Sequence, residues 1–204
     1  MTPEQQKMCT DKLDRSLVRS RSQAGRSLSY LEGHYVIRRL NTIFGPGGWS
    51  YRCMTREVYR ERLEDETKSG KVWRWHVSYS STCVLTIGDC RIEDVGHGHG
   101  IDKDCGLAIE SAEKEAATDS LKRCAKSLGD SLGLALYDKD QVNVIDPAAV
   151  DLVAMFVEAH TLEQLAAAKE SARVAWKGLD QPSRDAVGKA QIEAKARIEA
   201  VKAA

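Results

Sequence analysis

The sequence predicts an α+β fold in which an antiparallel β-sheet, built on a long curved hairpin, packs on helices and precedes a small all-α C-terminal module. Three observations predict this fold. Residues 72–87 alternate apolar and polar side chains over sixteen positions, which is typical of a long strand with one wet face. Residues 107–128 form a long helical segment, and beyond residue 146 the composition shifts to helix-forming residues.

Shorter strands are predicted on both sides of residues 72–87. Residues 49–54 alternate before a charged segment, 60–71, that we expect to be a turn. Gly88 and Asp89 form a tight turn, after which residues 90–96 return as a third strand. The glycine-rich stretch GHGHGIDKD, residues 96–104, is predicted to be a loop that leads into the long helix.

A helix with one apolar face is predicted to start at a capping box formed by Ser29 and Glu32 and to end at Gly45. The preceding residues, 1–26, are polar and rich in serine and arginine. Two interpretations stay open for them. They form either a solvated arm around one short helix or a basic arm that reaches DNA or a neighbouring subunit.

The shift in composition at Asp146 and Pro147 predicts a domain boundary, with residues 1–145 as one domain and residues 146–204 as a helical module. Helices are predicted over residues 147–159, from a capping box at Thr161 through residue 176, and from residue 183 to the end.

Composition excludes several classes of protein. The chain has 204 residues, and 30 basic side chains balance 30 acidic ones, so bulk charge argues neither for nor against a nucleic-acid partner. No apolar run is long enough to span a membrane, and the N-terminus does not resemble a secretory signal, so a cytoplasmic protein is expected. His97, His99 and Cys105 match no zinc spacing, so neither a metal nor a cofactor is predicted, and the six cysteines are expected to be reduced.

A basic cluster, Lys122, Arg123 and Lys126, lies on one polar face at the end of the long helix. One interpretation is structural, because cations complement the helix dipole and Asp119 can pair with them. The other is a polyanion site beside the polar, Arg74-bearing face of the sheet. Aromatic residues near this charge suit single-stranded nucleic acid, although core packing is the better interpretation of Trp75.

Three blocks of the sequence occur in this order: YLEGHYVIRRLNTIFGPGGW, EDVGHG and SAEKEAATDSLKRCAKSLGDSLGLALYDKD. Together they resemble the Rad fifty-two family of single-strand annealing proteins. The resemblance covers roughly residues 15–142. It implies an α+β fold, a ring of identical subunits, and annealing of complementary single-stranded DNA in recombination and double-strand break repair without ATP. In such a ring the phosphates lie in a basic groove and the bases stay exposed for pairing. The family proteins are not enzymes in this activity.

The resemblance also implies site residues. Lys122, Arg123 and Lys126 match the basic cluster of the family's inner DNA groove. A further groove arginine of the family is replaced here by Tyr35, so Arg38 or Arg39 is expected to substitute, or Tyr35 to stack on a base or sugar. Lys103 is the candidate for an outer DNA site.

Other functions remain open. A recombination mediator and a helical interaction scaffold are the main alternatives, and a metal-dependent nuclease using Glu66, Lys68, Glu93 and Asp94 is a weaker one. The module 146–204 is expected either to dock a single-strand-binding protein or an exonuclease, or to brace the ring. The short chain suggests a phage or bacterial member, associated with the nucleoid.

Overall fold

A computed structural model describes residues 1–23, 25–68 and 70–203. The chain divides into two compact units. The first unit contains Met1–Asp11 and Leu31–Leu134, and the second contains Lys12–Tyr30 and Ala135–Ala204. The predicted domain boundary after residue 145 stays a prediction.

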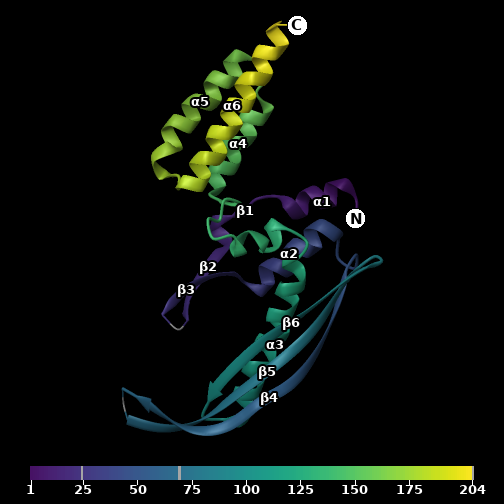
Figure 1. The fold of residues 1–204 in the computed structure, drawn as a ribbon, viewed down its shortest axis with the longest axis vertical. Coiled ribbons are helices and arrows are strands. Elements are labelled where there is room, and N and C mark those ends of the chain that lie inside the picture. Colours follow the sequence, from purple (N-terminus) through teal and green to yellow (C-terminus); the bar gives the residue numbers. More distant parts are fainter. Residues whose placement is uncertain (24, 69, 204) are drawn as a thin grey trace. The chain divides into compact units, whose positions relative to one another are not determined.

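The first unit is built on a three-stranded antiparallel sheet in the order β4-β5-β6 (Figure 1). The strands are β4 (Ser50–Thr67), β5 (Gly70–Ile87) and β6 (Cys90–Asp102). The sheet with its long hairpin confirms the predicted fold class, and β5 confirms the strand predicted from period-two alternation.

Two predicted boundaries in the sheet are wrong. The charged segment 60–71 is not a turn, because β4 continues through it to Thr67 and pairs with β5 as far as Gly70. The stretch GHGHG is not a loop, because β6 continues through it to Asp102. Charged side chains and alternate glycines hide the period of a strand from a hydrophobicity pattern, yet both segments complete the backbone hydrogen bonds of β5.

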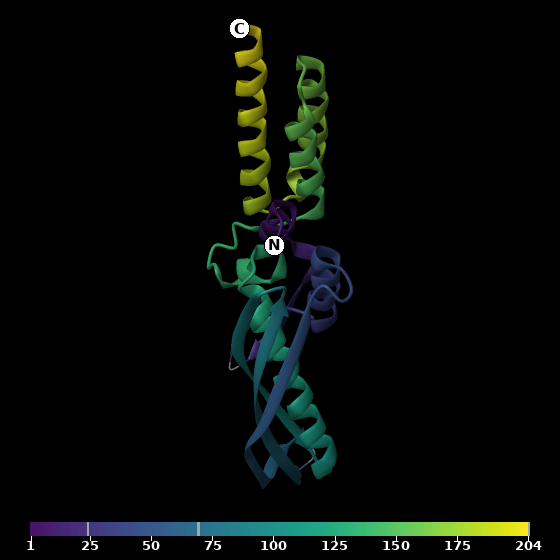
Figure 2. The same cartoon turned by 90° about the vertical axis from the view of Figure 1, so that its right-hand side faces the viewer.

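Helix α3 (Cys105–Lys126) runs along one face of this sheet in both Figure 1 and Figure 2. Small residues four apart in the helix, Ala108, Ala112 and Ala116, are fully buried against it. They meet alternate glycines of β6. A Cβ atom on Gly98 would overlap backbone atoms of Ala112 and Ala116, and Gly96 and Gly100 are equally restricted. The glycines therefore allow the helix to approach the strand backbone directly.

Helix α2 (Gly33–Phe44) packs beside α3 and buries Val36, Leu40 and Ile43, as predicted from their helical spacing. Ile37, which was predicted on the same core face, is 37% exposed. The predicted capping box is wrong. Glu32 is the N-cap residue without a side-chain cap, and Ser29 lies in a strand. The first unit is completed by α1 (Pro3–Thr10), which has its own capping box at Thr2, and by the 3-10 helix η2 (Asp130–Leu132).

The second unit has a separate core formed by three helices. The helices are α4 (Pro147–Glu158), α5 (Leu162–Ala175) and α6 (Gln181–Ala203). They bury Phe156, Leu165 and Val187 together with further aliphatic residues. The capping box at Thr161 is confirmed, with Gln164 as its partner. Two more 3-10 helices are η3 (Leu134–Tyr137) and η4 (Trp176–Gly178).

The segment between α1 and α2 forms three short strands and a 3-10 helix. Strand β1 (Leu13–Asp14) pairs in parallel with β7 (Val144–Ile145), and the 3-10 helix η1 (Arg15–Leu17) follows it. Strands β2 (Val18–Gln23) and β3 (Arg26–Leu31) form a two-stranded sheet. Across residues 1–23, 25–68 and 70–203, no helix is both long enough and apolar enough to cross a membrane.

Candidate nucleic-acid interface

The basic cluster lies in the last turns of α3, where the edge of strand β6 runs beside the helix. Arg123 Nε donates to Asp119 Oδ2 at 2.9 Å, and the same carboxylate oxygen accepts the backbone N–H of His97 at 3.3 Å. Lys126 Nζ lies 4.0 Å from Asp94 Oδ2 on β6. Carboxylates on the helix and on the strand edge thus orient Arg123 and Lys126.

Acidic side chains accept hydrogen bonds along this edge. Glu115 Oε2 accepts the N–H of His99 at 2.9 Å, one helical turn before Asp119. An edge strand presents outward N–H groups to solvent, and here carboxylates from α3 cover two of them. The pairing of Asp119 with the basic cluster, expected from helical spacing, is confirmed for Arg123. Sequence reasoning missed the role of Asp119 and Glu115 toward β6.

The cations of the basic cluster remain partly accessible to solvent. The Arg123 side chain is 40% exposed and that of Lys126 20% exposed, while Lys122 is half-buried. A guanidinium carries five N–H donors, so a contact of Nε with Asp119 is compatible with phosphate contacts by the same group. Arg123 and Lys126 also complement the C-terminal end of the helix dipole. The arrangement can therefore hold an anionic backbone.

Helix α2 carries three further predicted site residues near the end of α3. Tyr35 Oη donates to the carbonyl of Ser131 at 3.2 Å, directly after α3. The Arg39 guanidinium contacts Ser131 Oγ, the Met8 carbonyl and Asp11 Oδ2 at 3.2, 2.5 and 3.1 Å. These contacts give Arg39 a structural role that ties α1 and η2 to α2. Arg38 is exposed.

Arg74 belongs to a polar cluster on the sheet face opposite α3. Its Nε lies 2.6 Å from Asp65 Oδ2, and Asp65 also contacts His76 Nε2 at 2.9 Å. Burial opposes ionisation of Asp65, but the hydrogen bond with His76 and the charge of Arg74 hold the pKa of this carboxyl below its ordinary value. His99 lies beside His76 with ring centres 5.9 Å apart.

The predicted residues fall into two groups. Lys122, Arg123 and Lys126 lie at the C-terminal end of α3, whereas Lys103 is exposed just before its N-terminal end. A helix of 22 residues separates them by roughly 30 Å. Arg74 belongs with Lys103, because β5 pairs with the end of β6 through Trp75 and Asp102. One local site therefore cannot contain all of the predicted residues.

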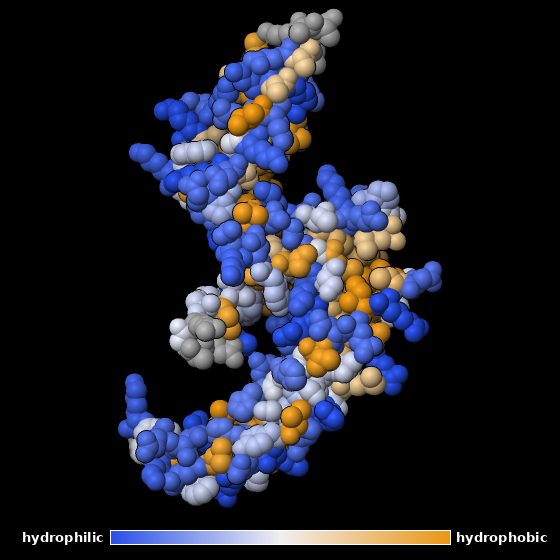
Figure 3. Space-filling view, viewed as in Figure 1, coloured by the Kyte–Doolittle hydropathy of each residue, from blue (hydrophilic) through white to orange (hydrophobic). Residues whose placement is uncertain are grey.

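The aromatic residues divide in the same way. Trp75 packs against the buried cluster of Val77, Ala108 and Ala112, which confirms its core interpretation. Trp73 is 53% exposed. Tyr51 stacks on Trp49 with ring centres 5.8 Å apart. On the face drawn in Figure 3, hydrophobic residues of the sheet occur between hydrophilic ones and do not merge into one large patch.

The thiols and the acidic residues suggest no further chemistry. All six cysteines are free, and Cys9, Cys83 and Cys124 are buried. Burial raises the pKa of the Cys83 thiol, which also lies beside Cys53 and Cys124. Within the described part of the chain, no three His, Cys, Asp or Glu side chains gather in a way that could hold a metal ion.

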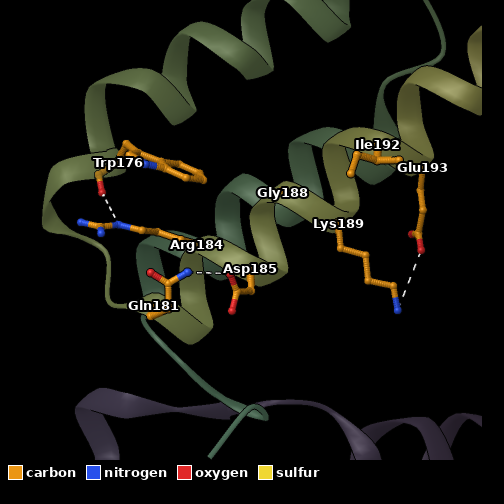
Figure 4. Close-up of a pocket in the computed structure, with 8 residues that line it drawn as sticks. All are labelled: Trp176, Gln181, Arg184, Asp185, Gly188, Lys189, Ile192 and Glu193. Atoms are coloured by element: carbon orange, nitrogen blue, oxygen red, sulfur yellow. Dashed lines mark hydrogen bonds and ion pairs between the residues drawn. The ribbon is translucent and has the colours of Figure 1, made fainter.

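The second unit contains a shallow groove between the end of α5 and helix α6 (Figure 4). The Trp176 side chain and the exposed Ile192 lie on either side of Gly188. Arg184 Nε donates to the Trp176 carbonyl at 3.1 Å, and Lys189 lies 4.0 Å from Glu193. The groove has a volume of about 530 Å³.

Comparison with known proteins shows the family. Residues 2–151 match the Rad52/22 family of double-strand break repair proteins. This match covers most of the chain, so the protein belongs to the Rad52/22 family.

Several fungal proteins are similar to this chain. The DNA repair and recombination protein radC of Emericella nidulans is 32% identical over 151 residues, 71% of this chain and 25% of radC. The DNA repair and recombination protein rti1 of Schizosaccharomyces pombe is 37% identical over 125 residues, which are 59% of this chain and 32% of rti1. The DNA repair and recombination protein RAD52 of Saccharomyces cerevisiae is 36% identical over 129 residues, which are 61% of this chain and 25% of RAD52. The matched region thus spans about a quarter to a third of these relatives.

Proposed function

We propose that this protein binds single-stranded DNA and anneals complementary strands without ATP, in recombination and double-strand break repair. The observation that carries the proposal is the basic end of α3, where Lys122, Arg123 and Lys126 gather on one rigid helix beside the edge of β6. The repair and recombination names of the family members support it.

The physical reason concerns charge. Two complementary strands repel each other through their phosphates, and a protein that neutralises one backbone lowers this repulsion. If the protein contacts only phosphates and leaves base edges exposed, base pairing itself selects the partner strand. This mechanism needs positioned cations but neither a nucleotide, a metal nor a catalytic residue. We therefore propose a binding protein rather than an enzyme.

We propose further that identical subunits assemble into a ring that carries the DNA strand along a continuous basic groove. Three cations on one chain contact only a few phosphates, whereas repeated copies of the same cluster would hold a long strand. A recombination mediator acting through the same binding surface is the alternative function. The phage or bacterial origin stays a prediction, since the relatives described above are fungal.

Annealing of two complementary oligonucleotides tests the proposal directly. We expect the purified full chain to accelerate annealing in the presence of EDTA and without nucleotide, and its affinity for single-stranded DNA to fall as salt rises. Fluorescence energy transfer between labelled strands measures the rate, and light scattering measures the assembly. Salt-sensitive binding without acceleration would favour the mediator. Absence of DNA binding would contradict the proposal and favour an interaction scaffold.

The helical module, residues 146–204, is proposed to dock a single-strand-binding protein, with a partner exonuclease as the other candidate. Its separate core and the groove between Trp176 and Ile192 support this proposal. Deletion of the module is a poor test, because Arg15 Nε lies 2.5 Å from Asp180 Oδ2 and the deletion would remove this anchor. A point variant in the groove is sharper.

We expect Ile192→Ser to leave annealing of naked strands unchanged and to slow annealing of strands coated with a single-strand-binding protein by several-fold. Ile192 is 70% exposed, so its loss should not disturb the helical core. Val174→Ser on α5, where the side chain is 75% exposed, is the matched control. Equal slowing on both substrates would indicate a brace of the ring, and an unchanged rate on both would contradict docking at this groove.

A further inference from the structure

Residues 15–30 concentrate positive charge in a chain whose total charge is zero. The segment RSLVRSRSQAGRSLSY contains four arginines and no acidic residue. It includes strands β2 and β3, which we call the arginine hairpin.

The base of this segment is anchored within the second unit. Arg15 Nε lies 2.5 Å from Asp180 Oδ2, and Arg15 donates a hydrogen bond to the Val144 carbonyl at 2.8 Å. Arg15 therefore has a structural role, and the adjacent pairing of β1 with β7 fixes where the hairpin starts. The remaining arginines lie farther along the hairpin.

One face of the hairpin combines arginines with an aromatic ring. Arg19 and Arg21 are two residues apart in β2, so they share a face, and both are exposed. The Arg21 guanidinium lies 5.8 Å from the centre of the Tyr30 ring, which places Tyr30 on that face. Leu28, two residues before Tyr30 in β3, is 42% exposed. Basic groups beside an aromatic ring suit a nucleic-acid strand.

A two-stranded sheet is marginally stable alone in water, so the hairpin should gain order from a surface that it contacts. We propose that the arginine hairpin is a second nucleic-acid site, in which Arg19 and Arg21 bind the phosphates of single-stranded DNA. This inference rests on the proposed function for its ligand. A neighbouring copy of the chain suits the hairpin less well, because residues 15–30 include four arginines, no acidic residue and few large apolar side chains.

The double variant Arg19→Ala/Arg21→Ala in the full chain tests this site. We expect weaker binding of a fluorescent oligothymidine and a salt dependence that is shallower by about 1.4 in log–log slope, roughly 0.7 for each lost phosphate contact. The control Arg173→Ala/Lys195→Ala removes two exposed cations from the same unit and should retain the wild-type slope. Arg19→Lys/Arg21→Lys should restore most of the slope, because lysine keeps the charge.

The outcomes separate the two proposals. A wild-type protein that does not bind the oligonucleotide overturns both. A wild-type protein that binds, together with a hairpin variant whose slope equals that of the control, overturns the hairpin site alone. If the hairpin variant keeps the wild-type slope but assembles into smaller particles, the hairpin contacts a neighbouring subunit, which also overturns the site. Circular dichroism and thermal melting verify that each variant is folded.

Discussion

The triple variant Lys122→Ala/Arg123→Ala/Lys126→Ala is expected to lose strand annealing while it remains folded and assembled. If each side chain contacts one phosphate, the salt dependence of single-strand binding should become shallower by about 2 in log–log slope, roughly 0.7 for each contact. The cost to folding should be about 0.6–2 kcal/mol, because Arg123 and Lys126 lie in the last turn of α3 and each cation there contributes about 0.3–1 kcal/mol. Fluorescence anisotropy titrated against salt measures the slope.

A control with the same loss of charge makes this result specific. Lys68, Lys71 and Lys114 are exposed lysines of the same unit, and their replacement by alanine also removes three positive charges. If this control loses as much affinity as the triple variant, general charge and not the helix end holds the DNA. If the triple variant anneals at the wild-type rate, its cations serve the helix dipole and the contacts with Asp119 and Asp94, and the DNA site lies elsewhere.

Sequence patterns predicted elements well where one physical signal dominated. The strand over residues 72–87 has a buried face and a polar face, so its period of two was visible, and the core face of α2 was visible at helical spacing. The helical tail followed from its caps and composition, and the box at Thr161 formed as predicted. The capping box predicted at Ser29 did not form, because β3 continues to Leu31 and Ser29 is part of that strand.

The candidate site was predicted only in part, because its partners are distant in sequence. Helical spacing revealed that Asp119 can pair with Arg123, since both lie on one helix. It could not reveal that Asp94 lies 4.0 Å from Lys126, or that Arg39 contacts Met8 and Ser131. The contact of Lys126 with Asp94 depends on the packing of α3 against β6, and the stretch that enables this packing was predicted to be a loop.

That stretch offered a signal of its own. Glycines at positions 96, 98 and 100 recur with the period of a strand, and Ala108, Ala112 and Ala116 recur with the period of one helix face. Two matched stripes of residues without bulky side chains indicate a helix lying directly on a strand backbone. The contact positions α3, and with it the basic cluster, against the edge of β6.

Gly98→Ala is therefore expected to lower the free energy of unfolding of the first unit by about 3 kcal/mol. The added Cβ atom would overlap the Ala112 carbonyl oxygen and the Ala116 nitrogen, which are backbone atoms inside a helix. A flexible side chain could rotate away, but here α3 must shift as a whole and lose part of its contact with β5 and β6. Chemical denaturation monitored by circular dichroism measures the change.

Two controls separate this overlap from other effects of the substitution. Gly188→Ala is the same substitution in helix α6, where no atom lies within 4 Å of an added Cβ atom. This variant should therefore stabilise the helix by about 0.5–1 kcal/mol. His97→Ala lies next to Gly98 in β6, with its side chain on the exposed face, and should change stability little. Should Gly98→Ala prove as stable as the wild type, α3 would not lie directly on the β6 backbone. The basic cluster would then lose its contacts with Asp94 and with the N–H of His97, so this measurement also tests the geometry on which the proposed DNA site depends.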